Sequence, residues 1–276
     1  MRDGILKQIA DENAKKKELP CLAVLLIGDN PVCQKYAELK KKMAEKIGVQ
    51  ANLYLFDQKD SEQDILDCIE FLNSDPETQG VMIQIPIDKK FDRDKLIAAI
   101  STEKDVDGLR YCAGLESNFK PPVVLAIIEA LRQSLGSSNL EAGIWEKKKI
   151  SLIGHGFLVG NPLERTLKEL GATDLTVVTS ENILDSKFQI LNSDIVISAV
   201  GKAGIVTAEM VKEGVILIDA GTTEQNGELI GDISAEAYKK ASFYTPVPGG
   251  IGPATVGMLF SNLAKSKSFG SVQDIK

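Results

Sequence analysis

Short apolar segments alternate with helix-forming segments along most of this chain, from about residue 20 to residue 245. The apolar segments have the length and composition of buried strands, and the others have the 3.6-residue periodicity of helices. This alternation is typical of parallel sheets, in which crossover helices join successive strands. A length of 276 residues allows about two domains or one large unit of this kind. The sequence therefore predicts an α/β fold.

The first half of the chain predicts one complete α/β unit. Gly48 is a natural stop for its first helix, and Pro86 ends its third strand. The polar run 104–108 follows as a loop, after which the unit closes. Strands are expected over 22–27, 51–56 and 80–85, helices over 32–47 and 61–73, and a mostly helical segment over 87–100.

Pro121 and Pro122 mark the best boundary, because consecutive prolines interrupt both helices and strand ladders. A second α/β unit begins near Lys149, and a tail with helical spacing follows it. The expected elements are a helix over 123–135, a loop over 136–143, strands over 150–153, 175–178, 195–200 and 215–218, a helix over 162–170 and the helical tail over 255–264. We expect a first domain of residues 1–120, to which residues 250–276 return, and a second domain of residues 121–249.

Composition limits the partners and the compartment. The longest apolar runs, 21–27 and 215–218, are far too short to cross a bilayer, and charge interrupts the N-terminal segment where a signal peptide needs an apolar stretch. Four scattered cysteines and a single histidine favour reduced thiols over a disulfide framework or a metal site. The net charge of -7 would repel a phosphate backbone. We expect a cytoplasmic protein with no nucleic-acid partner, no membrane partner and no metal.

A glycine-rich loop, G-H-G-F-L-V-G over 154–160, stands between a predicted strand and a predicted helix. Gly154 would permit the tight turn, Gly156 would let a pyrophosphate approach the backbone, and the helix N-terminus would supply N–H donors. The spacing is one residue longer than the common fingerprint, so a tight turn without a ligand is the alternative. The context favours a dinucleotide site with Gly154, His155 and Gly156 as contacts.

The residues after the next strand bear on the choice between NAD and NADP. A carboxylate there favours the ribose 2′-hydroxyl of NAD, whereas a basic side chain favours the 2′-phosphate of NADP. Glu181 would repel a 2′-phosphate, but Ser180 and His155 could donate hydrogen bonds to one. Glu181 could also be a solvated loop residue. These residues leave both dinucleotides open.

Three polar side chains of the first unit are candidates for a binding site. Tyr36 and Lys40 lie four residues apart and share one helix face, which suits a flat heterocycle beside an amine. The adjacent Lys41 and Lys42 fit a solvated basic face equally well. Gln84 is an amide in an apolar strand and needs partners, either in a structural network or on a ligand.

Two loops also carry chemistry. Asp105 and Asp107 flank a valine and are compatible with an Asx turn, a metal loop or a substrate contact, of which the residues alone favour the turn. The rigid Pro/Gly loop over 245–253 has little side chain, and its backbone N–H groups could hold a carbonyl or carboxamide.

Together these segments resemble the bifunctional methylenetetrahydrofolate dehydrogenase/cyclohydrolase family over nearly the whole chain. The order and spacing of the matching motifs fit as well. The motifs are L-A-V-L-L-I-G-D-N-P followed by Y-x-x-x-K (22–40), G-V-M-I-Q-I-P (80–86), K-D-V-D-G (104–108) and T-P-V-P-G-G-I-G-P (245–253). The resemblance implies an N-terminal α/β substrate domain, a Rossmann-like parallel-sheet dinucleotide-binding domain and a C-terminal helix that packs back on the first domain. It also implies a homodimer, with the folate in the cleft between the domains.

The resemblance assigns roles to individual residues. It implies that Tyr36 stacks on the folate and that Lys40 is catalytic, with Gln84 as its hydrogen-bond partner, and that Asp107 holds the pterin. The implied reactions are oxidation of 5,10-methylenetetrahydrofolate and hydrolysis of the methenyl product to 10-formyltetrahydrofolate, within one-carbon metabolism and purine biosynthesis. The full set of substrate contacts implied is Tyr36, Lys40, Gln84, Asp107, Pro248, Gly249 and Gly250, of which Lys40, Gln84 and Asp107 are catalytic.

The chain departs from the family pattern mainly on the cofactor side. His155 replaces the arginine of Gly-Arg-Ser, Glu181 replaces a basic residue, and Thr222 ends a segment that reads Asp-Val-Gly-Ile in the family. In addition, 121–124 replaces Pro-Cys-Thr-Pro. We expect NADP as the cofactor, contacted by Gly154, His155, Gly156, Ser180, Glu181 and Thr222, with NAD possible because of His155 and Glu181. The alternatives are a single-activity relative, either a cyclohydrolase or an NAD-linked dehydrogenase, and a non-catalytic folate-binding protein.

Overall fold

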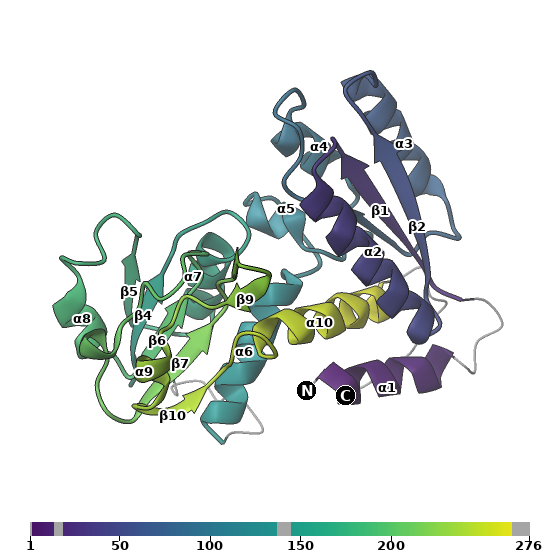
Figure 1. Ribbon diagram of the computed structural model, residues 1–276. Coiled ribbons are helices and arrows are strands. Elements are labelled where there is room, and N and C mark those ends of the chain that lie inside the picture. Colours follow the sequence, from purple (N-terminus) through teal and green to yellow (C-terminus); the bar gives the residue numbers. More distant parts are fainter. Residues whose placement is uncertain (1, 14–18, 137–144, 267–276) are drawn as a thin grey trace. The chain divides into compact units, whose positions relative to one another are not determined.

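The computed structural model describes residues 2–13, 19–136 and 145–266. The chain divides into two compact units: unit 1 is Met1–Pro122 with Val256–Lys276, and unit 2 is Val123–Thr255. The divisions fall near the start of helix α6 (Pro122–Ser134) and within helix α10 (Ile251–Lys265), which therefore belong to both units (Figure 1).

Unit 1 is built on a parallel sheet with the strand order β2-β1-β3. Its strands are β1 (Cys21–Ile27), β2 (Gln50–Phe56) and β3 (Gly80–Ile83), and its helices are α1 (Arg2–Asn13), α2 (Pro31–Lys46), α3 (Glu62–Ser74), α4 (Arg93–Ala99) and α5 (Leu109–Cys112). All seven residues of the central strand β1 are buried. The second half of α10 contributes Leu259, Phe260 and Leu263 to the core of this unit.

Local hydrogen bonds explain where the main helices of unit 1 begin. The Asn30 side chain accepts from the backbone N–H of Val32 at 2.9 Å and so caps α2, with Pro31 at its first position. Ser61 and Asp64 form a reciprocal capping box at the start of α3. These caps fix the ends of the two helices that follow β1 and β2.

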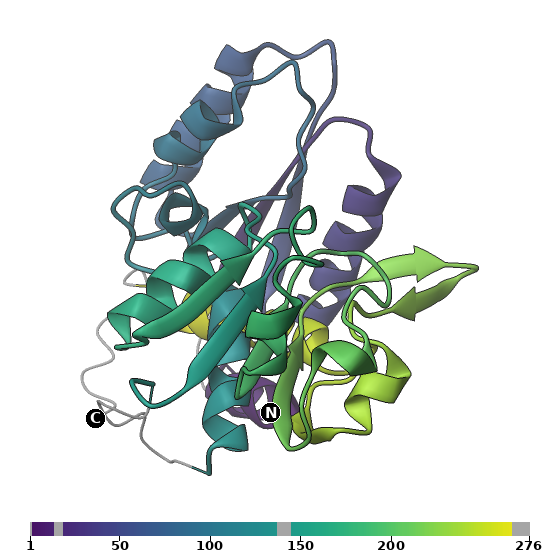
Figure 2. The same ribbon diagram turned by 90° about the vertical axis from the view of Figure 1, so that its left-hand side faces the viewer.

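Unit 2 contains a parallel sheet with the strand order β10-β7-β6-β4-β5. Because β4 has β5 on one side and β6 on the other, the strand order reverses at β4, which is where α/β sheets of this type bind ligands. A β8–β9 hairpin extends from the sheet (Figure 2). The elements are β4 (Lys149–Ile153), α7 (Gly160–Glu169), β5 (Asp174–Val178), α8 (Lys187–Leu191), β6 (Ile195–Ser198), η1 (Ala208–Met210), β7 (Val215–Asp219), β8 (Thr223–Gln225), β9 (Glu228–Ile230), α9 (Ala235–Tyr238) and β10 (Ala241–Tyr244).

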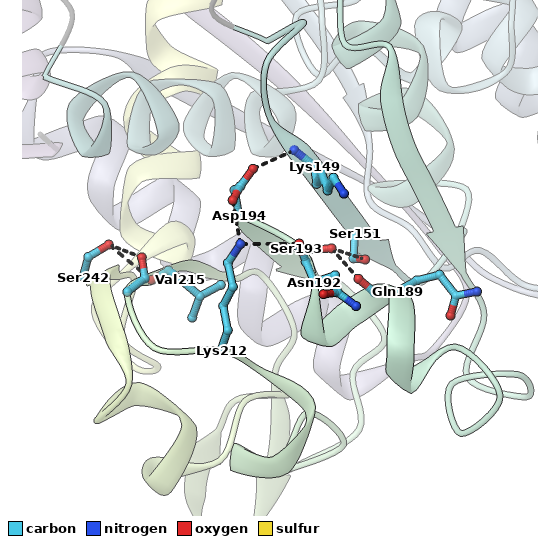
Figure 3. Close-up of polar contacts among 10 residues, drawn as sticks. Lys149, Ser151, Gln189, Asn192, Ser193, Asp194, Lys212, Val215 and Ser242 are labelled. Carbon is cyan, nitrogen blue, oxygen red and sulfur yellow. Dashed lines mark hydrogen bonds and ion pairs between the residues drawn. The ribbon is translucent and has the colours of Figure 1, made fainter.

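Polar contacts tie together the segments that lead into the strands of unit 2 (Figure 3). Asp194 accepts from the backbone N–H of Lys149 at 3.0 Å and pairs with the Lys212 Nζ at 2.7 Å. The Ser151 and Ser193 hydroxyls are 2.8 Å apart, and Ser193 also donates to a backbone carbonyl of α8. These contacts join β4 to the segment that precedes β6. They lie toward the N-terminal ends of these strands, whereas the glycine loop follows the C-terminal end of β4.

Four sequence predictions need correction. The strand expected over 80–85 ends at Ile83, so Gln84 follows the strand and does not lie within it. The helix expected over 87–100 starts only at Arg93, because the Asp88 and Asp92 side chains accept backbone N–H groups and hold the preceding segment in turns. The strand expected over 195–200 ends at Ser198. The loop expected over 245–253 gives way to α10 at Ile251, which places Pro253 in the first helical turn, where its missing N–H costs nothing. Apart from Gly136, the loop expected over 136–143 lies outside the described residues.

No helix in the described part of the chain has both the length and the apolar character needed to span a membrane. Over the same residues, no three histidine, cysteine, aspartate or glutamate side chains gather in a way that could hold a metal ion.

Candidate active site

Lys40 and Gln84 form the centre of the polar site in unit 1. The Lys40 Nζ donates to the Gln84 Oε1 at 2.9 Å and lies 3.9 Å from the Met82 sulfur. Gln84 follows β3, and its backbone N–H donates to the Leu25 carbonyl of β1 at 2.9 Å. Its side-chain amide also donates to the Ile85 carbonyl, which leaves the Oε1 directed at the lysine. The sheet therefore holds the glutamine that positions the Lys40 amine.

Burial dominates the electrostatics of Lys40 and Asp107. Loss of solvent lowers the pKa of Lys40, and the charges of Asp107 and Cys33 only partly oppose that effect. Burial likewise raises the pKa of Asp107, and the Lys40 charge opposes it. The Lys40 amine is therefore neutral more often in this site than it would be in water. The neutral amine is the form that can accept a proton.

The K-D-V-D-G loop places Asp107 beside Lys40 by fixing the residues around it. The Lys104 Nζ donates to the Leu72 and Asp75 carbonyls at 2.7 and 2.6 Å, at the end of α3. Asp105 accepts the backbone N–H groups of Leu109 and Arg110 at 3.0 and 2.8 Å, and burial raises its pKa to about 7. The first aspartate thus binds the first N–H groups of α5, four and five residues further on, and does not form the Asx turn that was predicted. The second aspartate interacts electrostatically with the lysine.

Tyr36 and Cys33 occupy the same helix as Lys40. Tyr36 is 43% exposed, so its ring is accessible on the surface of α2. Cys33 is buried, its thiol lies 3.4 Å from the Pro86 carbonyl, and its charge is one of those acting on the pKa of Lys40. Sequence reasoning missed Cys33 and Met82 as neighbours of the lysine. The only available signal for Cys33 was its seven-residue spacing from Lys40, which amounts to two helical turns.

The glycine loop of unit 2 has the shape that a dinucleotide pyrophosphate needs. Gly154 has φ +99°, and a Cβ there would lie 2.6 Å from the Ala199 carbonyl oxygen, so the turn excludes any side chain. Gly156 differs, because no protein atom lies within 4 Å of the position of its Cβ. Packing therefore does not require this glycine, whereas close approach of a ligand to the backbone would.

The glycine loop and the end of β5 lie side by side. Ile153 of β4 is in register with Val178 of β5, and the Gly154 N–H donates to the Val178 carbonyl at 2.7 Å. His155 therefore follows β4 where Ser180 and Glu181 follow β5, and all three residues are exposed. The His155 Nε2 lies 2.7 Å from the Glu164 Oε2 of α7, a partner that the sequence did not reveal.

Two buried carboxylates shape the turns after β6 and β7. Asp232 accepts the Ser198 hydroxyl at 2.8 Å and the N–H groups of Val200, Gly201 and Lys202 at 2.7, 3.2 and 2.8 Å. Asp219 is bound in the same way, and three of its donors are backbone N–H groups of Gly221, Asp232 and Ile233. Both turns lie at the carboxyl ends of the strands, where the ligand crevice of such sheets is found.

The remaining predicted contacts are also in unit 2. Thr222 is exposed directly after the turn that Asp219 holds. Pro248 and Gly249 are exposed, and the Gly250 N–H donates to the Pro246 carbonyl at 2.8 Å. Within unit 1 the structure brings Lys40, Gln84 and Asp107 together; within unit 2 it brings His155 to the end of β5. The ligand contacts of all these residues stay predictions.

Family comparisons cover both units. Residues 1–107 match the family described as "Tetrahydrofolate dehydrogenase/cyclohydrolase, catalytic domain", and residues 134–269 match "Tetrahydrofolate dehydrogenase/cyclohydrolase, NAD(P)-binding domain". The chain is 36% identical to the "Bifunctional protein FolD" of Staphylococcus haemolyticus over 270 residues, which is 95% of this chain and 90% of the relative. It is also 36% identical to the protein of the same name from Aquifex aeolicus, over 96% of this chain and 91% of the relative.

Solved structures show the same likeness. The bifunctional FolD methylenetetrahydrofolate dehydrogenase/cyclohydrolase of Campylobacter jejuni aligns with a TM-score of 0.85 at 33% identity, over 96% of this chain and 95% of that one. The Trypanosoma brucei dehydrogenase-cyclohydrolase, in complex with NADP and an inhibitor, aligns with a TM-score of 0.83 at 29% identity, over 95% and 93% of the two chains.

Proposed function

The chain belongs to the tetrahydrofolate dehydrogenase/cyclohydrolase family, and from that premise we propose that it oxidises 5,10-methylenetetrahydrofolate with NAD(P) and hydrolyses the methenyl product to 10-formyltetrahydrofolate. The observation that supports this most directly is the group of Lys40, Gln84 and Asp107, in which a half-buried amine is hydrogen-bonded at 2.9 Å and its pKa is influenced by a carboxylate charge. A protein that only bound folate would not need an amine with a lowered pKa.

The two units have separate tasks in this proposal. Unit 1, close to the predicted domain of residues 1–120 with 250–276, binds the folate through Tyr36, Asp107 and Lys40. Unit 2, close to residues 121–249, holds the dinucleotide at Gly154 and Gly156. When bound, the dinucleotide accepts a hydride from the methylene carbon of the folate. The protein residues contribute orientation to that step, because the folate nitrogens stabilise the cation that forms.

Lys40 acts in the hydrolytic step. Water adds to the methenyl carbon, and the neutral Lys40 amine accepts a proton from it. The bond from that carbon to N5 then breaks as the added hydroxyl becomes the formyl carbonyl and loses its proton to solvent. The protonated Lys40 gives its proton to N5, and the formyl group stays on N10. Overall, one water is consumed and one proton is released. Gln84 keeps the amine in place by accepting one of its N–H groups, and Asp107 holds the pterin.

We further propose a cytoplasmic homodimer with neither a nucleic-acid nor a membrane partner. The homodimer rests on the family resemblance. The net charge of -7 supports the absence of a nucleic-acid partner, and the four scattered cysteines suit a reducing compartment. Light scattering of the purified chain tests the dimer, which a monomeric mass would contradict.

The first test measures both reactions in the purified protein. Dehydrogenation is followed with 5,10-methylenetetrahydrofolate and either dinucleotide, with acid quenching to trap the methenyl product, and hydrolysis is followed with methenyltetrahydrofolate alone. We expect turnover in both assays. Hydrolysis without dehydrogenation, or the reverse, would reduce the protein to a single-activity relative. No activity in either assay would leave folate binding as its function.

A further inference from the structure

Glu164 joins the glycine loop to helix α7 through a hydrogen bond with the only histidine of the chain. Its Oε2 lies 2.7 Å from the His155 Nε2, and its Oε1 accepts from the Lys168 Nζ at 2.6 Å. The bond from Lys168 is the largest cause of the lowered pKa of Glu164, so the carboxylate is charged at neutral pH. Its side chain is 20% exposed, compared with 39% for His155, so the glutamate is the more buried partner.

We propose that Glu164 is a specificity-determining residue of the dinucleotide site, which disfavours NADP relative to NAD by holding the His155 ring and placing a negative charge beside the cofactor's 2′ position. This inference rests on the proposed function, because it assumes that unit 2 binds a dinucleotide. It concerns only which of the two dinucleotides the site accepts more readily.

The position of this pair relative to the sheet supports the assignment. In sheets of this kind the cofactor's 2′ substituent is read at the end of the strand that follows the glycine loop, which here is β5. The Gly154 N–H is bonded to the last residue of β5, Val178, at 2.7 Å. His155 is the next residue after Gly154 and therefore lies at the same edge as Ser180 and Glu181, and Glu164 is bonded to it.

The charges at this edge are mostly unsuited to a phosphate. Glu164 and Glu181 are both acidic, and Glu181 follows the strand at the place where a carboxylate favours a free 2′-hydroxyl. Lys168 is basic, but its amine is already bonded to Glu164. His155 is the basic side chain that the glycine loop itself carries, and its Nε2 is also committed to Glu164. The pair therefore occupies one of the two side-chain donors, His155 and Ser180, that could bind a 2′-phosphate here.

Replacement of Glu164 by glutamine tests this directly, because glutamine keeps the size of the side chain and removes the charge. A close pair of unit charges in water interacts by about 1 kcal/mol, so removal of the carboxylate charge should change the relative affinity for the phosphate about fivefold. The Glu236→Gln variant is the matched control, because Glu236 is an exposed acid on α9 in the same unit.

The experiment measures kcat/KM and, by calorimetry, Kd for NAD and for NADP in the original chain and in both variants, after circular dichroism has shown that each is folded. We expect Glu164→Gln to raise the NADP/NAD ratio about fivefold and Glu236→Gln to leave it unchanged. An unchanged or lowered ratio in Glu164→Gln, or the same rise in the control, would overturn the assignment.

The two readouts separate this inference from the proposed function. Binding of dinucleotides without turnover would contradict the proposed dehydrogenase, and the ratio of dissociation constants would still decide the role of Glu164. Turnover with an unaltered ratio would contradict only the role of Glu164. If the original chain bound neither dinucleotide, both would fall.

Discussion

At the scale of single residues, the opposing effects of burial and charge on Lys40 decide its chemistry. Burial lowers the pKa of the amine, whereas the Asp107 carboxylate raises it. Lysine can respond to such surroundings because its amine deprotonates within an accessible range, which an arginine does not. The two carboxylates of the K-D-V-D-G loop serve different purposes, since Asp105 accepts backbone N–H groups and Asp107 interacts electrostatically with the lysine.

The pH dependence of hydrolysis follows from these directions. Because the proposed active form is the neutral amine, we expect kcat at saturating substrate to rise with pH and to level off at an inflection below 10.5, the ordinary value for lysine. Asp107→Asn removes the carboxylate that raises the pKa of Lys40, so its inflection moves to lower pH. Lys40→Arg stays charged and loses about a hundredfold or more in kcat. An inflection that Asp107→Asn leaves in place or moves upward would contradict this account.

At the scale of elements, the glycine loop combines a glycine that packing requires with one that it does not. A Cβ at Gly154 would collide with the turn after β6, and the Asp232 carboxylate holds that same turn. Gly156 faces open space, so its role depends on what occupies that space.

This difference predicts the effect of Gly156→Ala. The substitution has room in the protein, so we expect a normal fold and about a tenfold weaker binding of dinucleotide, because the added methyl keeps the pyrophosphate from the backbone. Gly4→Ala is the matched control, since Gly4 is also unobstructed but lies in α1. It should leave binding unchanged and stabilise the helix by at most about 1 kcal/mol. Equal affinities in the two variants, measured by calorimetry, would show that no pyrophosphate passes Gly156.

Sequence patterns predicted the buried elements well and the exposed ones poorly. β1 was visible because all its residues are apolar, and burial on both faces requires that composition. β8 and β9 were missed because they are short, polar strands with few buried residues, and α4 was placed too early because side-chain caps override periodicity.

The contact between Lys40 and Gln84 joins residues 44 positions apart, so no local spacing could reveal it, and only the family resemblance implied it. The His155–Glu164 pair escaped for a similar reason, because it joins a loop to a helix.

At the scale of the whole molecule, the fold separates the two proposed reactions by unit. The acid–base group belongs to unit 1 and the glycine loop to unit 2, so substitutions in each unit should affect the two activities differently. We expect a change at the glycine loop to remove only the redox step. We expect a change at Lys40 to remove hydrolysis, because the proposed hydride transfer depends on orientation and not on a proton held by the protein.

The most direct test of this account is the fate of the methenyl intermediate in Lys40→Met, a variant of similar side-chain length that has no amine. With 5,10-methylenetetrahydrofolate and the preferred dinucleotide, the original chain should release 10-formyltetrahydrofolate. The variant should instead accumulate methenyltetrahydrofolate, with hydrolysis reduced by about a hundredfold or more. A Lys40→Met protein that hydrolyses methenyltetrahydrofolate at the original rate would contradict the assignment of Lys40 and with it the central claim.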